Sequence, residues 1–348
     1  MQGWFLQSPK LLSDKHRDKA AAWQLQLTKP AGSLGRLETL AVELAAMQHK
    51  LHPHVQKVDI CVFAADQGVC AEGVSAFPQS VTSQMIANFV GGGAAISVLA
   101  KSLGANLSVV NLGTVFESVS HASIFDRTIA SQSGNIVKQP AMTEEQLQTA
   151  LMQGKEALTR ARKSGCELFI AGEMGIGNTT TTTALLVKLL HLPVTDLVGS
   201  GTGLNAKGVA HKVEVIERAL ARHQQAILPL DILRCLGGFE LAALVGSYIA
   251  AAQAGIPVLV DGFICTTAAL LACRVNPGVE AWLILAHASA EPGHKAAAQA
   301  LNKVPLLDFQ LRLGEASGAA LAVPLLRLAC DLHNNMATFA EAGVADKA

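Results

Sequence analysis

The sequence has little charge, no excess of either sign and no paired cysteines. Charged residues make up 16% of the 348 positions, and 27 basic side chains balance 27 acidic ones, so the formal net charge is zero. There is no basic run and no interleaving of basic and aromatic residues, which argues against a nucleic-acid-binding protein. So few charges in a chain that is 50% hydrophobic indicate a large core and further surface buried between subunits.

Features of secreted and membrane proteins are also missing. The seven cysteines are scattered without a Cys-x-x-Cys pair, as is typical of small core residues in a reducing cytoplasm. The first nine residues hold no basic segment followed by an apolar one, so we expect no signal peptide and a cytoplasmic location. The longest apolar stretch, 256–273, contains Asp261 and Gly262, which favours a strand, a turn and a helix over a membrane span.

From residue 58 onward, short apolar runs alternate with helical patterns. The runs lack polar alternation, which predicts an α/β fold with a mostly parallel sheet covered by helices on both faces; they are 58–64, 107–112, 168–171, 256–260 and 282–285. Helical patterns at both chain ends fall outside this alternation. We therefore expect a small helical domain of residues 1–55 and 316–348 beside a large domain of residues 56–315.

Polar side chains follow several of the predicted strands. In an open parallel sheet, the carboxyl ends of the strands border the ligand crevice. A binding site is therefore expected at this edge of the sheet, near Asp66, Asn111, Glu173, Asp261, His287 and Ser289.

A glycine-rich turn follows the run at 168–171 and leads into five threonines, 179–183, which open a helix. Such a turn presents backbone N–H groups and a helix N-terminus to a phosphate. It has neither the Gly-Lys-Ser/Thr ending of a Walker A loop nor the Gly-x-Gly-x-x-Gly dinucleotide pattern. Glu173 in the turn would repel a bare phosphate and is expected to face a ribose hydroxyl or a cationic ring. A plain glycine-rich connection before a helix is the alternative.

Two further motifs have both a functional and a structural interpretation. Ser80 and Gln84 lie one helical turn apart beside Phe77, which suits a flat, uncharged heterocycle, although a capped helix with an incidental glutamine is the commoner case. Glu315 is expected in the first turn of the last helix among small residues, where a carboxylate more often complements the helix dipole than acts as a catalyst.

Metal and nucleophile patterns are not evident. His287, Glu291 and His294 do not match a common zinc spacing, and a turn before a helix explains them better. No order of serine, histidine and aspartate and no reactive-cysteine pattern stands out.

Several stretches together resemble one family over nearly the whole chain, the nicotinate-nucleotide–dimethylbenzimidazole phosphoribosyltransferases. The glycine–threonine stretch and the Leu-Gly-Glu-Ala-Ser-Gly stretch are specific in combination, and the order and separation of the motifs also match. One departure is Gln67, where the family pattern has histidine. The stretches that carry the resemblance are 29–38, 65–69, 78–85, 172–181, 199–204, 261–263 and 313–318.

The resemblance implies a reaction. The phosphoribosyl group of nicotinate mononucleotide would pass to 5,6-dimethylbenzimidazole with inversion at C1′, giving α-ribazole 5′-phosphate and nicotinate for the lower ligand of cobalamin. The leaving group is already a cationic pyridinium, so no metal and no cofactor is expected. The resemblance also implies a homodimer, a Rossmann-like large domain and a small helical domain made from both chain ends.

The same resemblance assigns roles to residues. Glu315 would be the base that removes the proton of the attacking ring, and Glu173 would lie near the ribose or the developing positive charge. Ser80 and Gln84 would line the benzimidazole pocket. The remaining substrate contacts are expected from Gly175, Ile176, Gly177, Asn178, Thr179, Thr180, Gly201, Gly203, Lys212 and Ser289.

Two other functions stay open. One is a non-catalytic, nucleotide-binding regulatory protein that uses the same crevice. The other is an ordinary phosphoribosyltransferase that uses pyrophosphorylated ribose and magnesium, which predicts an acidic pair ahead of a small-residue phosphate loop, and the sequence has no such segment.

Overall fold

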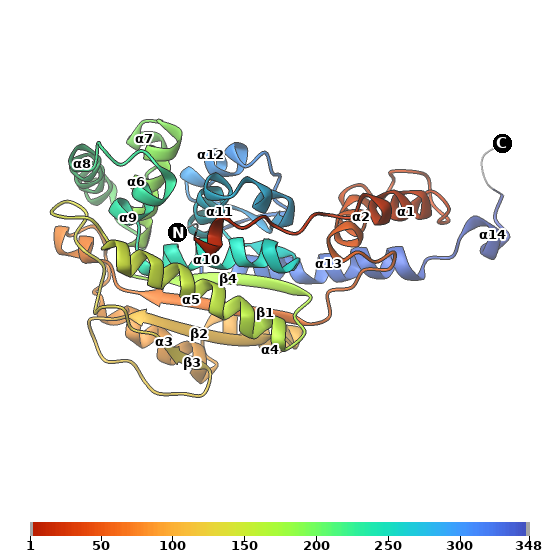
Figure 1. The fold of residues 1–348 in the computed structure, drawn as a ribbon, viewed down its shortest axis with the longest axis horizontal. Coiled ribbons are helices and arrows are strands. Elements are labelled where there is room, and N and C mark those ends of the chain that lie inside the picture. The colour runs from red at the N-terminus through yellow and green to blue at the C-terminus, as the bar shows by residue number, and fades with distance from the viewer. Residues whose placement is uncertain (1–2, 346–348) are drawn as a thin grey trace.

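A six-stranded parallel sheet in the order β3-β2-β1-β4-β5-β6 organises the computed structural model, which describes residues 3–345 (Figure 1). The chain builds outward from β1 in one direction and from β4 in the other, so the strand order reverses between these two strands. This is the strand order of the Rossmann fold, and it confirms the predicted α/β class. The strands are β1 (Val58–Ala65), β2 (Asn106–Gly113), β3 (Ile124–Asp126), β4 (Leu168–Met174), β5 (Val258–Val260) and β6 (Leu283–Leu285).

Helices cover both faces of the sheet (Figure 1). On one face α5 (Glu144–Lys163) packs on α10 (Phe239–Ala254), which lies over β1 and β4. On the other face lie α3 (Ser80–Gly91), α4 (Ala95–Leu103) and the start of α13 (Ser317–Asn335). The other helices are α6 (Asn178–Leu190), α7 (Val194–Leu197), α8 (Ala206–Arg222), α9 (Pro229–Leu236), α11 (Phe263–Val275) and α12 (Gly293–Ala300).

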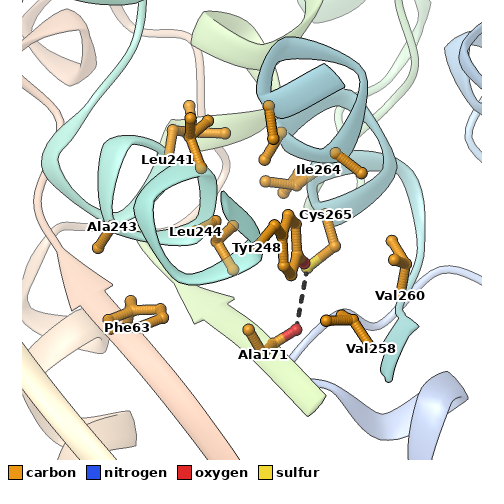
Figure 2. Close-up of a cluster of buried hydrophobic side chains, with 14 of the residues drawn as sticks. Phe63, Ala171, Leu241, Ala243, Leu244, Tyr248, Val258, Val260, Ile264 and Cys265 are labelled. Carbon is orange, nitrogen blue, oxygen red and sulfur yellow. Dashed lines mark hydrogen bonds between the residues drawn. The ribbon is translucent and has the colours of Figure 1, made fainter. Parts of the chain in front are cut away.

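The core beneath β4 is apolar and tightly packed. Figure 2 shows Tyr248 of α10 beside Cys265 of α11, with side chains of the strands around them. The Cys265 thiol donates a 3.4 Å hydrogen bond to the carbonyl of Ala171, so α11 is tied to the middle of β4. The side chains of Tyr248 and Cys265 are almost fully buried, at 0% and 1% exposed. This core holds β4 in place, and with it the residues at its carboxyl end.

A smaller group of helices lies beyond the sheet (Figure 1). There α1 (Asp14–Gln24) and α2 (Arg36–Gln48) pack on each other, and α2 packs on α13. The indole nitrogen of Trp23 donates to the carbonyl of His333 at 2.8 Å, and Leu27 pairs with Thr338 just before α14 (Phe339–Ala342). We propose that these helices form the small helical domain expected from the sequence.

The residues before α1 cross to the other part of the molecule. The segment 4–10, which begins with the short helix η1 (Trp4–Leu6), lies against α10 and η3 (Pro277–Trp282). The Asn276 amide donates to the carbonyls of Phe5 and Gln7, and the Trp282 indole donates to the carbonyl of Lys10. We call residues 4–10 the N-terminal strap.

One segment of the described residues, Ser80–Leu103, is apolar and long enough by composition to cross a membrane. It is not one continuous helix, because α3 ends at Gly91 and Gly92 adopts a left-handed conformation before α4 begins. The two helices have 12 and 9 residues, each shorter than the ~20 residues that a span requires. The break therefore argues against a membrane helix.

Candidate active site

A cavity of about 320 Å³ lies at the carboxyl edge of the sheet, beside the point where the strand order reverses. Its walls come from the end of β4 and the following turn, the loop at 201–202, the segment after β5, the short strand β7 (His287–Ser289), and Phe77 before α3. The segment 312–314, which follows β8 (Leu307–Leu311), the parallel partner of β7, forms another wall. This is the crevice where open α/β sheets bind their ligands.

The turn after β4 forms one wall. Gly175, Ile176, Asn178 and Thr179 line the cavity, and Gly177, left-handed with φ 94°, caps α6, so the N-terminus of that helix opens at the cavity. The sequence placed Gly172 and Glu173 in the turn, whereas β4 continues through both because β1 pairs with β4 up to Met174. The backbone N–H groups and the positive end of α6 suit a phosphate.

Glu173 is a buried carboxyl at the end of β4. Its exposed fraction is 6%, and its Oε2 accepts a hydrogen bond from the amide of Asn178. Burial raises the pKa of Glu173 to about 8, and the nearby Asp261 and Glu315 carboxyls add to the rise. Before a substrate binds, Glu173 is therefore mostly protonated at neutral pH.

Lys212 lies behind the turn. This fully buried side chain on α8 donates to Thr179 Oγ1 at 2.8 Å and to the carbonyl of Gly199 at 3.3 Å. Burial lowers its pKa to about 8, against the opposing charge of Glu291. An ammonium group surrounded mainly by neutral oxygens is poorly compensated, so an anion at the turn would stabilise its charged form.

Glu315 stands on irregular backbone. Gly314, Glu315 and Ala316 have consecutive positive φ angles of 87°, 62° and 68°, a conformation that costs free energy for residues with a side chain. The sequence predicted Glu315 inside the last helix, but α13 begins only at Ser317. The carboxyl is 7% exposed, and its Oε2 has no hydrogen-bond partner within residues 3–345.

The environment of Glu315 shifts its acidity. Burial raises its pKa to about 7, and the charge of Asp261 contributes. A carboxyl that titrates near neutrality and has a free oxygen is suited to accept a proton.

The backbone of this segment lies directly against β4. A Cβ atom at Gly172 would sit 2.5 Å from the Ala316 nitrogen, and one at Gly314 would sit 2.5 Å from Oε1 of Glu173. Glycine at these positions therefore lets the segment of Glu315 pack directly on β4. Glu173 and Gly314 line the cavity, whereas Glu315 itself is buried next to it and is not among the lining residues.

Ser80 and Gln84, the two side chains expected to bind the benzimidazole, lie near the cavity but do not line it. Ser80 and Gln84 lie on α3, and Gln84 is exposed, whereas Phe77 lines the cavity. The helix is nevertheless attached to the phosphate turn, since Thr82 Oγ1 accepts from the nitrogen of Ile176 at 3.2 Å.

The other predicted contacts divide in the same way. Gly201 and Ser289 line the cavity, whereas Gly203 and Thr180 do not. The Thr180 side chain is fully buried inside α6.

Among the lining residues that were not named as site residues from the sequence, four have acidic, basic or imidazole side chains: Asp261, His287, Glu291 and Arg312. Asp261 and His287 were noted as polar groups at strand ends, and that position was the available signal; His287 and Glu291 were also weighed as metal ligands and set aside. Arg312, the cationic side chain of the lining, donates to the carbonyl of Gly201 at 3.2 Å. Within the described part of the chain, no cluster of three or more His, Cys, Asp or Glu residues is arranged to hold a metal ion.

Comparison with known proteins agrees with this geometry. A family model described as phosphoribosyltransferase matches residues 10–344. A protein of Pseudomonas fluorescens is 59% identical over 345 residues, 99% of this chain and 98% of its own length, and one of Xanthomonas oryzae is 58% identical over 343 residues, 99% of both. Both are named nicotinate-nucleotide–dimethylbenzimidazole phosphoribosyltransferase.

A solved structure supports the same relationship. The crystal structure of the enzyme of that name from Thermus thermophilus superimposes with a TM-score of 0.91 at 42% identity, covering 97% of this chain and all of that one. With the fold, the cavity and near-complete coverage in agreement, the chain belongs to the nicotinate-nucleotide–dimethylbenzimidazole phosphoribosyltransferase family.

Proposed function

We propose that the cavity binds nicotinate mononucleotide and 5,6-dimethylbenzimidazole and transfers the phosphoribosyl group to the base, giving α-ribazole 5′-phosphate and nicotinate for cobalamin assembly. The observation that carries the proposal is the pair of buried carboxyls at the cavity: Glu173 lines it, Glu315 directly follows the lining residue Gly314, and burial raises both pKa values toward neutrality. The names of the relatives state the same two substrates.

The nucleotide would be held by its anionic groups. The backbone nitrogens of Gly175 and Gly177 and the N-terminus of α6 offer hydrogen-bond donors to the phosphate. Thr179 lines the cavity beside them, and Lys212 lies behind Thr179. Gly201 and Ser289 on the neighbouring walls complete the substrate contacts. Binding of an anion here would favour the charged form of Lys212, whose pKa is lowered to about 8 by burial.

The chemical step needs one proton acceptor. One ring nitrogen of the base attacks C1′ from the face opposite the pyridinium, and the bond from C1′ to nicotinate breaks. The bonding electrons neutralise the pyridinium, so the leaving group requires no acid. The other ring nitrogen loses its proton to Glu315, whose Oε2 is free to accept it.

Glu173 is proposed to stabilise the positive charge of the pyridinium and of C1′. The pyridinium and the developing cation at C1′ favour ionised carboxyls nearby, so nucleotide binding lowers the pKa of Glu173 from about 8. Protons released on binding then leave Glu173 negative where the positive charge is concentrated. This assigns a charge-stabilising role to Glu173 and the proton-accepting role to Glu315.

We also propose that the chain forms a homodimer. Val98 on α4 and Leu321 and Leu328 on the neighbouring α13 are 58%, 41% and 52% exposed, and Leu321 and Leu328 are two helical turns apart on one face. A two-fold dimer would cover such an apolar face. Light scattering should give twice the chain mass across micromolar dilution, and a monomer throughout would contradict the proposal.

The cellular location is proposed on thiol chemistry. All seven cysteines are unpaired, and burial raises the pKa of several of them, including Cys61 and Cys166 to about 12. Thiols in this state suit a reducing cytoplasm.

Product analysis tests the proposed reaction. The purified chain is mixed with nicotinate mononucleotide and dimethylbenzimidazole, with and without a chelator, and nicotinate and α-ribazole 5′-phosphate are measured. We expect equal release in both samples, since the chemistry requires no metal. Tight binding of both compounds without release would favour a regulatory nucleotide-binding protein, and loss of release with chelator would contradict the metal-free mechanism.

A further inference from the structure

Asp261 and His287 form a buried pair in the cavity wall that has no role in the mechanism above. Asp261 follows β5 and His287 begins β7, and they are 1% and 3% exposed. Their side chains meet with His287 Nε2 3.3 Å from Asp261 Oδ1. The same Oδ1 accepts a 2.8 Å hydrogen bond from the backbone nitrogen of Ala319 in the first turn of α13.

The imidazole of His287 is closely confined. A Cβ atom at Gly318 would sit 2.1 Å from its Cδ2, and one at Gly262 would sit 3.2 Å from its Nε2. The ring also stacks on His294, with centroids 6.3 Å apart and planes 13° from parallel. The orientation of His287 toward Asp261 is therefore fixed from three sides.

Asp261 is connected to Glu315 through the helix start. The bond from Ala319 to Asp261 anchors the first turn of α13, and Glu315 lies four residues before Ala319. Within that turn the nitrogen and the hydroxyl of Ser317 donate to the carbonyl of Gly314 at 3.0 and 2.6 Å, so the residues on both sides of Glu315 are held together. A shift of Asp261 would move the left-handed segment that carries Glu315.

We propose that Asp261, held in place by His287, is a positioning residue for Glu315: it anchors the start of α13 and keeps a negative charge beside the Glu315 carboxyl. The inference rests on the proposed function, because it assumes that Glu315 accepts the proton. It adds two residues to the reaction that act through Glu315 and are not proposed to contact the reacting atoms.

The charges around Glu315 define how the pair should act. Asp261 follows β5, Glu173 ends β4 and His287 begins β7, while Arg312 lies on the segment of Glu315 itself. Burial raises the pKa of Glu315 and the Asp261 charge raises it further. Burial is the largest single influence and alone would lower the pKa of His287. The hydrogen bond with Asp261, the charge of Asp261 and smaller contributions together outweigh burial, so the pKa of His287 is raised, and a protonated His287 partly balances the Asp261 charge.

The sign of each substitution follows from these charges. Asp261→Asn keeps an oxygen that can accept from Ala319 and removes the negative charge, so the pKa of Glu315 should fall. Turnover is lost at low pH when Glu315 is protonated. This fall of kcat on the acid side of the pH profile, the acid limb, should therefore move to lower pH. His287→Gln removes the balancing positive charge, and the acid limb should move to higher pH.

The test is the pH profile of kcat from pH 5 to 9 at saturating nicotinate mononucleotide and dimethylbenzimidazole. We expect Asp261→Asn to move the acid limb down by about one pH unit, as for a nearby charge. The matched control is Asp66→Asn, because Asp66 is also a buried carboxyl after a strand that accepts from a backbone nitrogen, that of Val115 at 2.9 Å. Its acid limb should stay at the wild-type pH.

An acid limb that stays in place for Asp261→Asn overturns the inference, and so does one that moves equally for both variants, because the effect would then be global. If Asp261→Asn does not fold, His287→Gln decides by the direction of its shift, and an unshifted limb overturns the proposal. A wild-type protein that releases no nicotinate is a different failure: it overturns the proposed function before any substitution is made, and this inference with it.

Discussion

Two buried carboxyls, Glu173 in the cavity lining and Glu315 next to the lining residue Gly314, stand on contrasting backbone. Glu173 belongs to a regular strand paired with β1, and its side chain is bound by Asn178. Glu315 stands in a run of left-handed residues, and its Oε2 has no partner among the described residues. Both are buried, and burial is the main reason for both raised pKa values, about 8 and about 7. The regular element thus holds a group that stabilises charge, while the strained segment presents a free oxygen to a proton.

The largest effect that would test this contrast is expected from Glu315→Gln, which keeps the shape and removes the basicity. Substrate binding should stay nearly intact, and turnover should fall by ~10²–10⁴-fold, the usual contribution of a positioned base. In the wild type, turnover should fall as pH drops below about 7, where Glu315 becomes protonated. The pH profile of kcat for the variant should lack this limb. Near-normal turnover at saturating substrate would make Glu173 the leading candidate for the base.

Glu173→Gln should slow turnover less, because it removes a charge and not the proton acceptor. Hydrogen bonds and contacts with a charged group are worth ~1.5–3 kcal/mol, which corresponds to a loss of roughly ten- to hundredfold. Raising the pH should not restore the rate, since the amide cannot ionise. The comparison is kcat at pH 7 and pH 9, and recovery at the higher pH would reverse the two roles.

Gly172→Ala tests the contact between the two regions. The new Cβ would press on the nitrogen of Ala316 at 2.5 Å, and overpacking of this kind costs ~1–3 kcal/mol of stability. Chemical denaturation should show the loss, with a lower kcat because Glu315 is displaced. Gly91→Ala is the control, since a Cβ at Gly91 meets no atom within 4 Å. Equal stability of the two variants would mean that residues 314–316 can shift away from the new methyl group without loss of stability.

The smallest expected effect concerns the residues that are expected to bind dimethylbenzimidazole. The resemblance assigns Gln84 to the benzimidazole pocket, although its side chain is exposed and outside the cavity lining. That assignment predicts that Gln84→Ala raises the KM for dimethylbenzimidazole about fivefold and leaves the KM for the nucleotide unchanged, because one side-chain hydrogen bond is worth ~1 kcal/mol. Phe77→Ala is the companion variant, since Phe77 lines the cavity. Should Gln84→Ala change neither KM, or both equally, Gln84 does not line the base site and Phe77 marks its wall.

The strands of the sheet were largely predictable because buried parallel strands are continuous apolar runs. The run at 168–171 marked β4, and that at 107–112 marked β2. The short strands β3, β7 and β8 were missed, since Ile124–Asp126 lies in a polar stretch, His287–Ser289 was taken as a strand end, and Leu307–Leu311 is not a continuous apolar run. Pattern reading detects burial on both faces, and these strands are too short or too polar to show it.

The site was predictable where local sequence determines it. The glycines and threonines after β4 predicted a turn followed by the start of a helix, and α6 begins at Asn178. The left-handed backbone at Glu315 and Ala316 could not be predicted, because neither residue type favours it and tertiary contacts, such as the packing against Gly172 and the bond from Ala319 to Asp261, maintain it. The contact of Asp261 with Ala319 joins positions 58 apart, and no local pattern contains that information.

The N-terminal strap has a consequence for how the chain folds during synthesis. Lys10 and Trp282, which its hydrogen bond joins, are 272 positions apart. Domains commonly fold in the order in which they leave the ribosome, and contacts between distant positions form slowly. The N-terminal strap can therefore reach its final position only after Trp282 has been synthesised, and α2 can pack on α13 only after that helix has emerged. The molecule should therefore complete its structure only after nearly the whole chain has emerged, with the surface under the strap open until then.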